Sequence, residues 1–477
     1  MRNQILAGVM ILLFIVFFSC ERDSDSILNN DAQESVIQVA SKAKESAANI
    51  GINIVLNTSV SDDILADLET YGNVMDVIYQ INGVRVRAKA EKLTLIQNLP
   101  YVEAAGPDAE RNAPPIDTVP VEDFADGLST WNLDAVNVTD FGFDNRQVPQ
   151  DGTGVYVGVL DTGLLDSWRQ YFPEERIMTE YAKSFGGGGA QGTNVSEQPN
   201  KWEHDQSSHG THVTSIILGY SMGGVPVNGV APNAIVIPVK VLNQNGSGWS
   251  SVIATGIIYM ADLKKGPLAN YPVVVNMSLS GRYLDPFEQA AIDYAIEAGV
   301  IIVASAGNRG MNGMGYPGAY EPVISVAASG FILEWQPFFN SGWWYNLNVS
   351  DPTNTEYFYI TDFSSRELTG QDLDVAAPGS WVVGPYQLNS GQTSYYFLGG
   401  TSQASPHVAG IVALMAQKNP NLTASEAETI LEDTAIDLAP GTRYVYNPDG
   451  SVAVYSWEAN ATGSGLVTAD AALAATP

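Results

Sequence analysis

The chain of 477 residues is poor in several chemically useful residue types, with one cysteine, Cys20, and four histidines. A lone cysteine excludes a disulfide bond within the chain. Basic residues are also scarce, because 22 lysines and arginines stand against 52 acids, for a formal charge of -30. Binding to a phosphate backbone requires a basic surface, so this composition argues against nucleic acid as a partner. Apolar residues make up 45% of the chain, enough for a sizeable core in two or three folding units.

The N-terminus carries an apolar run from Ile5 to Phe18. This run is too short for a membrane-spanning helix and has the length of an export signal. Cys20 follows it behind the small residue Ser19, as at a bacterial lipoprotein processing site. We therefore predict a signal over residues 1–20, a lipid anchor on Cys20 and a polar tether over residues 21–49. An ordinary secretory signal is the alternative.

Residues 50–111 show a pattern of their own. Apolar strands are predicted near residues 52–56 and 101–103, a hairpin around Asn82-Gly83, and helices after Ser61 and over residues 90–99. The order is strand, helix, two strands, helix, strand. A unit of this size is marginally stable alone, so we expect it to need a partner. The proline-rich and acidic residues 112–128 are predicted to be a linker.

From Gly154 onward, apolar strands alternate with helices. The strands are predicted at residues 155–160, 234–241, 273–278, 300–304 and 323–327, and the helices at 210–218, 250–263, 286–298, 402–417 and 425–431. Strands that are apolar on both faces are typical of a covered parallel sheet. Right-handed crossovers then give a doubly wound α/β domain, whose site lies at the carboxyl ends of the strands.

Ser402 is a candidate nucleophile. It lies in Gly-Gly-Thr-Ser-Gln-Ala-Ser-Pro-His-Val-Ala-Gly, residues 399–410, where an apolar run over residues 408–415 begins. This pattern predicts a tight turn that opens a buried helix, where glycines admit a substrate and the helix N-terminus stabilises negative charge. A serine hydroxyl is a weak nucleophile at neutral pH, so it needs a base and a group that orients the base.

The four histidines differ in their surroundings. His209 and His212 share one face at the start of a predicted helix, where a metal site with Asp205 is conceivable. No glutamate follows His209 as it does in zinc proteases, which argues against the metal. His407 follows the candidate serine by five residues and is interpreted as a packed helix histidine. His204 has no motif around it.

Asp161 ends the first predicted strand of the large domain, where doubly wound sheets keep their sites. It begins an Asp-Thr-Gly sequence, which is also the signature of the proteases that use two aspartates. Their chemistry needs a pair of carboxylates, and this chain has one Asp-Thr-Gly. A plain turn at the end of a strand is the remaining alternative.

Three segments together resemble the subtilisin-like serine proteases. They are Asp-Thr-Gly at residues 161–163, His-Gly-Thr-His-Val at 209–213, and Gly-Thr-Ser-Gln-Ala-Ser-Pro-His-Val-Ala-Gly at 400–410. Their order along the chain, Asp, His and Ser, is that of the family. The related sedolisin-type enzymes would carry glutamate in place of His209.

The resemblance implies a role for each matched residue. Ser402 would be the nucleophile, His209 the general base and then acid, and Asp161 the group that orients the imidazole. Asn308, in Ser-Ala-Gly-Asn at residues 305–308, matches the asparagine that helps to form the oxyanion hole.

Two further segments match the family's substrate-binding walls, which hold an extended peptide mainly by backbone hydrogen bonds. They are Gly246, Ser247 and Gly248, and Ser278, Leu279 and Ser280. Ser280 stands where the family usually has glycine, at the entrance to the pocket for the residue before the cut. We predict that it narrows or polarises this pocket.

The resemblance also implies a domain plan. Residues 50–111 would be a small ferredoxin-like α+β propeptide, a chaperone and inhibitor that is removed by self-cleavage near Arg111. Residues 129–477 would be a subtilisin-like catalytic domain with a mainly parallel, doubly wound sheet. Its residues 331–360 are an aromatic insertion, predicted to be a hairpin packed on the body rather than an exosite, and residues 443–457 a second hairpin. Structural calcium is common in the family, but no ligands are assigned, and the chemistry requires no cofactor.

Together these features predict an exported bacterial serine endopeptidase that acts on proteins or peptides through an acyl-enzyme. Its own propeptide would be its inhibitor, and the lipid on Cys20 would hold it to a membrane at the cell envelope, the alternative being secretion. A catalytically silent, surface-displayed binding protein on the same fold is the competing hypothesis, with the aromatic insertion as its working face.

Overall fold

The computed structural model describes residues 49–112, 117–121, 129–186, 194–389 and 391–477. The predicted signal, Cys20 and the tether up to residue 48 lie outside the described residues. Within the described part of the chain, no helix is long and apolar enough to cross a membrane.

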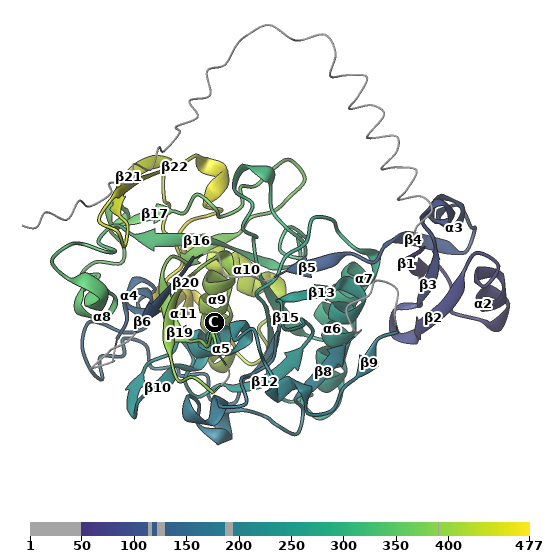
Figure 1. Ribbon diagram of the computed structural model, residues 1–477, viewed down its shortest axis with the longest axis horizontal. Helices are drawn as coiled ribbons and strands as arrows, with labels where there is room; N and C mark the ends of the chain where they lie inside the picture. Colours follow the sequence, from purple (N-terminus) through teal and green to yellow (C-terminus); the bar gives the residue numbers. More distant parts are fainter. Residues whose placement is uncertain (1–48, 113–116, 122–128, 187–193, 390) are drawn as a thin grey trace, which may run out of the picture. The chain divides into compact units, whose positions relative to one another are not determined.

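Residues 49–107 form a four-stranded antiparallel sheet with two short helices on it (Figure 1). The elements are β1 (Asn49–Leu56), α2 (Asp62–Leu68), β2 (Asn73–Ile78), β3 (Gly83–Lys89), α3 (Leu93–Gln97) and β4 (Val102–Pro107), in the sheet order β2-β3-β1-β4. Ser61 caps α2 as predicted, and Asn82 takes the left-handed conformation before β3. The second helix is shorter than predicted because its first turn, Ala90–Lys92, is a 3-10 helix.

The large sheet has nine strands, most of them parallel. Its central strands are β7 (Tyr156–Asp161), β12 (Ile235–Lys240), β14 (Val273–Met277), β15 (Val300–Ser305) and β16 (Ile324–Phe331). Beyond them lie β17 (Phe358–Ile360), β18 (Val375–Pro378), β8 (Lys183–Gly186) and β9 (Ser196–Glu197), the first and last of these four being antiparallel to their neighbours β16 and β8. Since β12 and β14 flank β7, the strand order reverses there, and the carboxyl end of β7 opens the crevice expected of doubly wound folds.

Alternate residues of these strands enter two separate hydrophobic cores, so both faces of the sheet are covered. One core contains α5 (His209–Leu218), α9 (Thr401–Lys418), α10 (Ala424–Thr434) and α11 (Ala469–Ala475), together with Val157 and Val159 of β7. The other contains α6 (Ser250–Lys265) and α7 (Pro286–Glu297), together with Leu160. The predicted doubly wound, mainly parallel α/β fold is therefore confirmed.

The aromatic insertion differs from its prediction. Only its two ends pair, where Phe331 of β16 faces Phe358 of β17. Between them lie 3-10 turns and the short helix α8 (Trp343–Asn346), whose Trp343 and Trp344 are fully buried. The insertion is packed on the body as predicted, but a hairpin over its whole length was wrong, because the buried indole rings lie in a short helix rather than in strands. The second predicted hairpin is present as β21 (Gly441–Tyr446) and β22 (Val452–Trp457).

The N-terminal sheet packs on α7 through β1 and β4 (Figure 1). Two short strands continue the chain toward the crevice. β5 (Glu110–Asn112) pairs antiparallel with β13 (Ser247–Trp249), and β6 (Asp117–Val121) pairs antiparallel with β20 (Tyr395–Gly399), the strand that leads into α9. The segments on either side of residues 113–116 are thus bound in extended form on the large domain.

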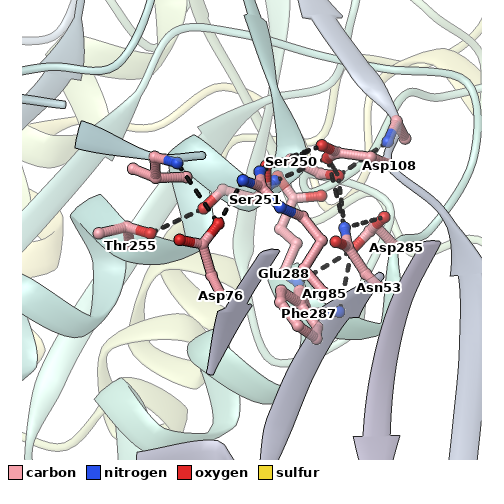
Figure 2. A network of polar contacts seen from close by, with 12 residues as sticks. Asn53, Asp76, Arg85, Asp108, Ser250, Ser251, Thr255, Asp285, Phe287 and Glu288 are labelled. Atoms are coloured by element: carbon pink, nitrogen blue, oxygen red, sulfur yellow. Dashed lines mark hydrogen bonds and ion pairs between the residues drawn. The ribbon is translucent and has the colours of Figure 1, made fainter. Parts of the chain in front are cut away.

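Next to β5, polar side chains join the N-terminal unit, residues 49–112, to the large domain (Figure 2). Asp108 accepts hydrogen bonds from the Ser250 hydroxyl at 2.9 Å and from the backbone N–H of Ser251 at 3.0 Å, which caps the N-terminus of α6. Asn53 of β1 donates from Nδ2 to the Asp285 carboxylate at 3.0 and 3.1 Å. Asp285 in turn caps α7 by accepting from the Phe287 N–H. Both helix caps therefore lie within the interface.

Candidate active site

Asp161 and His209 form a buried pair at the carboxyl end of β7. The Nδ1 atom of His209 lies 2.8 and 3.0 Å from the two carboxylate oxygens of Asp161, and neither side chain is exposed. The start of α5 can approach β7 this closely because residue 210 is glycine, where a Cβ atom would lie 2.4 Å from the Gly163 carbonyl oxygen. Burial alone would lower the pKa of His209, but the charge and hydrogen bond of Asp161 outweigh it, so the pKa is raised.

The turn before His209 is strained and held by Asp205. Ser208 takes a left-handed φ of 66°, an unfavourable conformation for a residue with a side chain. Asp205 accepts hydrogen bonds at 2.9 Å from the backbone N–H groups of both Ser207 and Ser208, which fixes that turn. Burial raises the pKa of Asp205 to about 6, and nearby Lys240 opposes the shift. Asp205 thus positions the histidine and adds negative charge near it.

Ser402 is the second residue of α9 and follows Gly400 directly after Thr401. Its Oγ donates to the Ser278 carbonyl oxygen at 3.2 Å, and the Ser278 hydroxyl donates back to the Ser402 carbonyl at 2.8 Å. The Nε2 atom of His209 is buried and has no hydrogen-bond partner in the described part of the chain. For a hydrogen bond between Ser402 and His209 to form, the Ser402 hydroxyl would have to turn from the Ser278 carbonyl toward this nitrogen, and bonds of this kind often tighten only when substrate is bound.

Asn308 lies beside the same turn. Its Oδ1 accepts from the backbone N–H and the hydroxyl of Thr401, both at 2.9 Å. A Cβ atom at Gly400 would lie 3.3 Å from Asn308 Nδ2. The oxygen is therefore engaged, and the amide N–H group is directed toward the residues that lead into Ser402. From this position the amide could donate to an oxyanion on a carbonyl group bound beside Ser402.

The other buried histidines serve the fold. Asn132 donates to Nε2 of His407 at 2.8 Å, and Nδ1 of His407 donates to the Gln403 carbonyl at 2.8 Å, which supports its interpretation as a packed helix histidine. Nε2 of His212 lies 3.1 Å from the Val382 carbonyl, and burial lowers its pKa to about 3. Within the described residues, His212, His209 and Asp205 form no group suited to a metal, so the sequence hypothesis of a metal site there has no support.

The predicted substrate walls flank the site. Ser247 and Gly248 belong to β13, which already carries β5 as an antiparallel neighbour, and Gly246 precedes them with φ of 70°. Ser278 and the buried Leu279 follow β14. Ser280 lies against two glycines, since a Cβ atom at Gly315 would be 2.7 Å from the Ser280 Cβ and one at Gly307 would be 3.2 Å from its Oγ.

One acidic group in the described part of the chain could hold a cation. Asp372, Asp374 and Glu428 place a carboxylate oxygen each within 4.8 Å of one another. Asp374 is 1% exposed, and its Oδ1 has no hydrogen-bond partner in the described residues. Three hard oxygen donors with one buried and unsatisfied oxygen suit calcium. The sequence did not indicate this group, because Glu428 comes from α10, far along the chain from the other two.

Comparison with known proteins identifies a family model and several relatives that match this chain. The model of the subtilase family matches residues 152–463. Subtilisin DY from Bacillus licheniformis is 33% identical over 297 residues, 61% of this chain and 88% of its own. Thermitase from Thermoactinomyces vulgaris is 30% identical over 307 residues, 63% of this chain and 90% of its own.

Among solved structures, fervidolysin from Fervidobacterium pennivorans, described as a keratinolytic enzyme related to subtilisin, superposes with a TM-score of 0.63 at 25% identity. The match covers 90% of this chain and 62% of fervidolysin. The chain belongs to the subtilase family and is a serine-type endopeptidase.

Proposed function

We propose that Ser402, His209, Asp161 and Asn308 carry out peptide-bond hydrolysis through an acyl-enzyme. The observation that supports this most is the buried Asp161–His209 pair. His209 is the first residue of α5, its Nε2 atom has no hydrogen-bond partner among the described residues, and Ser402 lies in the first turn of the neighbouring helix α9. Asp161 holds Nδ1 protonated and thereby presents Nε2 as the base. The remaining chemistry follows from these positions.

The Ser402 Oγ attacks the carbonyl carbon, and its proton passes to Nε2 of His209. The oxyanion accepts hydrogen bonds from the Ser402 backbone N–H and from Asn308 Nδ2. The imidazolium then gives its proton to the leaving amine nitrogen, and the C–N bond breaks. Water attacks the resulting ester with His209 again as base, which releases the acid and restores Ser402.

The substrate is proposed to bind as an extended strand beside β13 and the segment from Ser278 to Ser280. β5 already occupies β13 in this manner, and backbone pairing of this kind tolerates many sequences. The side chain of Ser280, which fills the space beside Gly307 and Gly315, would make the neighbouring pocket narrower and more polar. Identical cleavage of a peptide library by wild type and Ser280→Gly would contradict this.

Residues 50–111 are proposed to be a propeptide that inhibits the enzyme until self-cleavage near Arg111. β5 already occupies β13, the wall proposed to hold substrate, and β6 pairs with β20, the strand that leads into α9 and Ser402. N-terminal sequencing of the mature form would locate the cut. An active chain that retains residues 50–111 would contradict the propeptide role.

We further propose that the enzyme is exported, anchored by acylated Cys20, and stabilised by calcium at Asp372, Asp374 and Glu428. Incorporation of a labelled fatty acid that is lost in Cys20→Ala tests the anchor; an unlabelled protein would indicate plain secretion.

A fluorophosphonate probe tests the catalytic assignment. We expect the processed wild type to be labelled and Ser402→Ala to remain unlabelled and uncleaved. Absence of labelling in processed wild type would favour the silent binding protein instead.

A further inference from the structure

Arg111 enters the large domain with its side chain wholly buried. Its Nε donates to both carboxylate oxygens of Glu288, at 3.0 and 3.1 Å, and its Nη2 contacts the same carboxylate and donates to the Tyr283 carbonyl at 3.1 Å. Neither Arg111 nor Glu288 is exposed. A planar guanidinium with several donors fits this set of acceptors, whereas a lysine ammonium would reach fewer of them.

The backbone of Arg111 is bound in the manner of a substrate. It lies in β5 opposite Gly248 of β13, on the wall proposed to hold extended peptides. Side chains of a paired strand that point toward the domain enter pockets, and such pockets give specificity where the backbone gives none. The position of Arg111 therefore marks a side-chain subsite whose wall includes Glu288.

The two partners separate if the N-terminal unit is removed. Glu288 lies in the first turn of α7, within the part that matches the subtilase family, and stays with the enzyme. Asp285, one turn earlier and also buried, stays beside it (Figure 2). Two neighbouring acids would then lose the positive charge of Arg111, and a guanidinium that binds in its place would restore the charge-assisted hydrogen bonds. A site of this kind draws in a new cation.

We propose that Glu288 gives the processed peptidase a preference for arginine at the substrate residue that pairs with Gly248, so that Arg111 occupies a subsite later filled by substrate. This inference rests on the proposed function, since it requires peptides to bind along β13. The preference should be for arginine over lysine, because the Tyr283 carbonyl and both carboxylate oxygens are used together.

The test measures kcat/KM of the processed enzyme on quenched fluorescent peptides that share one sequence and carry a single arginine, lysine or leucine at successive positions before the cut. We expect one position at which arginine is cleaved at least tenfold better than leucine, with lysine between them. In Glu288→Gln, which keeps the side-chain volume, the ratio of arginine to leucine cleavage at that position should fall below about threefold.

Glu297→Gln, an exposed acid at the other end of α7, is the matched control and should keep the arginine preference. The wild-type comparison alone can overturn the proposal, so it does not depend on whether Glu288→Gln folds. Enzyme that is labelled by fluorophosphonate and cleaves arginine and leucine peptides equally at every position would refute the subsite but not the peptidase. Enzyme that neither reacts with the probe nor cleaves any peptide would refute both.

Discussion

Asp108 accepts hydrogen bonds from both the backbone N–H and the hydroxyl of Ser251, at 3.0 and 2.8 Å. A residue of the N-terminal unit thus completes the first turn of a helix in the large domain. Without Asp108, the backbone N–H of Ser251 in the first turn of α6 would lose this acceptor. The two parts are expected to unfold together in the uncleaved chain.

The first prediction concerns this cap. In an uncleaved Ser402→Ala background, Asp108→Ala should lose about 1–3 kcal/mol of unfolding free energy, because several charge-assisted hydrogen bonds are removed at once. Asp108→Asn should lose less, since one acceptor oxygen remains. Thermal or urea unfolding measures both. A loss in Asp108→Ala no greater than that in Glu103→Gln, an exposed change on β4, would speak against the cap.

The oxyanion assignment gives a second prediction. Asn308→Asp keeps an oxygen for Thr401 but loses the donor, and Asn308→Ala loses both. We expect kcat to fall about 10²- to 10³-fold in Asn308→Ala with little change in KM, the range known for one such donor in subtilisin itself. Asn308→Asp should fall at least as far, because its charge opposes the oxyanion. Steady-state kinetics on one peptide suffices; a rise in KM at constant kcat would argue for a role in binding instead.

The third prediction is a pH profile. His209 must be neutral to act as base, so kcat/KM should fall on the acid side as the imidazole takes up a proton, at a pKa above 6.5. The negative charges of Asp161 and Asp205 stabilise the imidazolium. Asp205→Asn removes one of them, so the acid limb should move to lower pH. Asp166→Asn, at an exposed position nearby, should leave the limb in place, and an equal shift in both variants would contradict the assignment.

A fourth prediction concerns stability. Burial raises the pKa of Asp134 to about 7, while its carboxylate accepts from the Val349 N–H at 2.7 Å. Between these two pKa values the folded state retains a proton that the unfolded chain has lost. The stability that Asp134 contributes is therefore fully present below its unfolded pKa of 3.8 and is lost as the pH rises through its folded pKa of about 7. Asp134→Asn keeps an acceptor oxygen for Val349 but cannot ionise. The Tm of this variant minus that of the wild type should therefore increase as the pH rises between these two pKa values. The exposed Asp144→Asn serves as control, and a constant difference in Tm would refute the shift.

Calcium provides the fifth prediction. Millimolar calcium should raise the Tm of the wild type. If the ion is present at a hundred times its dissociation constant, the free energy of unfolding should increase by about 2.7 kcal/mol. Asp374→Asn should lose most of this gain, because it removes a buried ligand oxygen. Asp433→Asn, exposed on α10, should keep it. Equal gains in all three proteins would place the ion elsewhere.

Much of the large domain could be predicted because its signals are local. The apolar runs of β7, β14 and β15 and the glycines before Ser402 each specify an element within a few residues, and the structure places those elements within one or two residues of the predicted ends. The pairing of Asp161 with His209 came from matching motifs rather than from periodicity.

The contacts that sequence reasoning missed join residues far apart. Arg111 and Glu288 are separated by 177 positions. An acid in the first turn of a helix is common, because the helix dipole stabilises its negative charge, so Glu288 alone gives no signal of a partner. The cap of α6 by Asp108 likewise crosses between the two parts of the molecule. The insertion was misjudged because its aromatic residues read as a strand pattern, whereas Trp343 and Trp344 are held by the core that only the complete fold provides.

The helix α9, whose second residue is Ser402, is buried from Thr401 to Ala416. We expect the amide hydrogens in the middle of this helix to exchange with solvent more slowly than those of exposed loops, because few small openings of the structure would reach them. A protease surrounded by copies of itself survives only as long as few of its own bonds become accessible. The proposed nucleophile, Ser402, therefore belongs to a segment that neighbouring enzyme molecules would cut late, and self-digestion should begin at exposed loops while this helix is still intact.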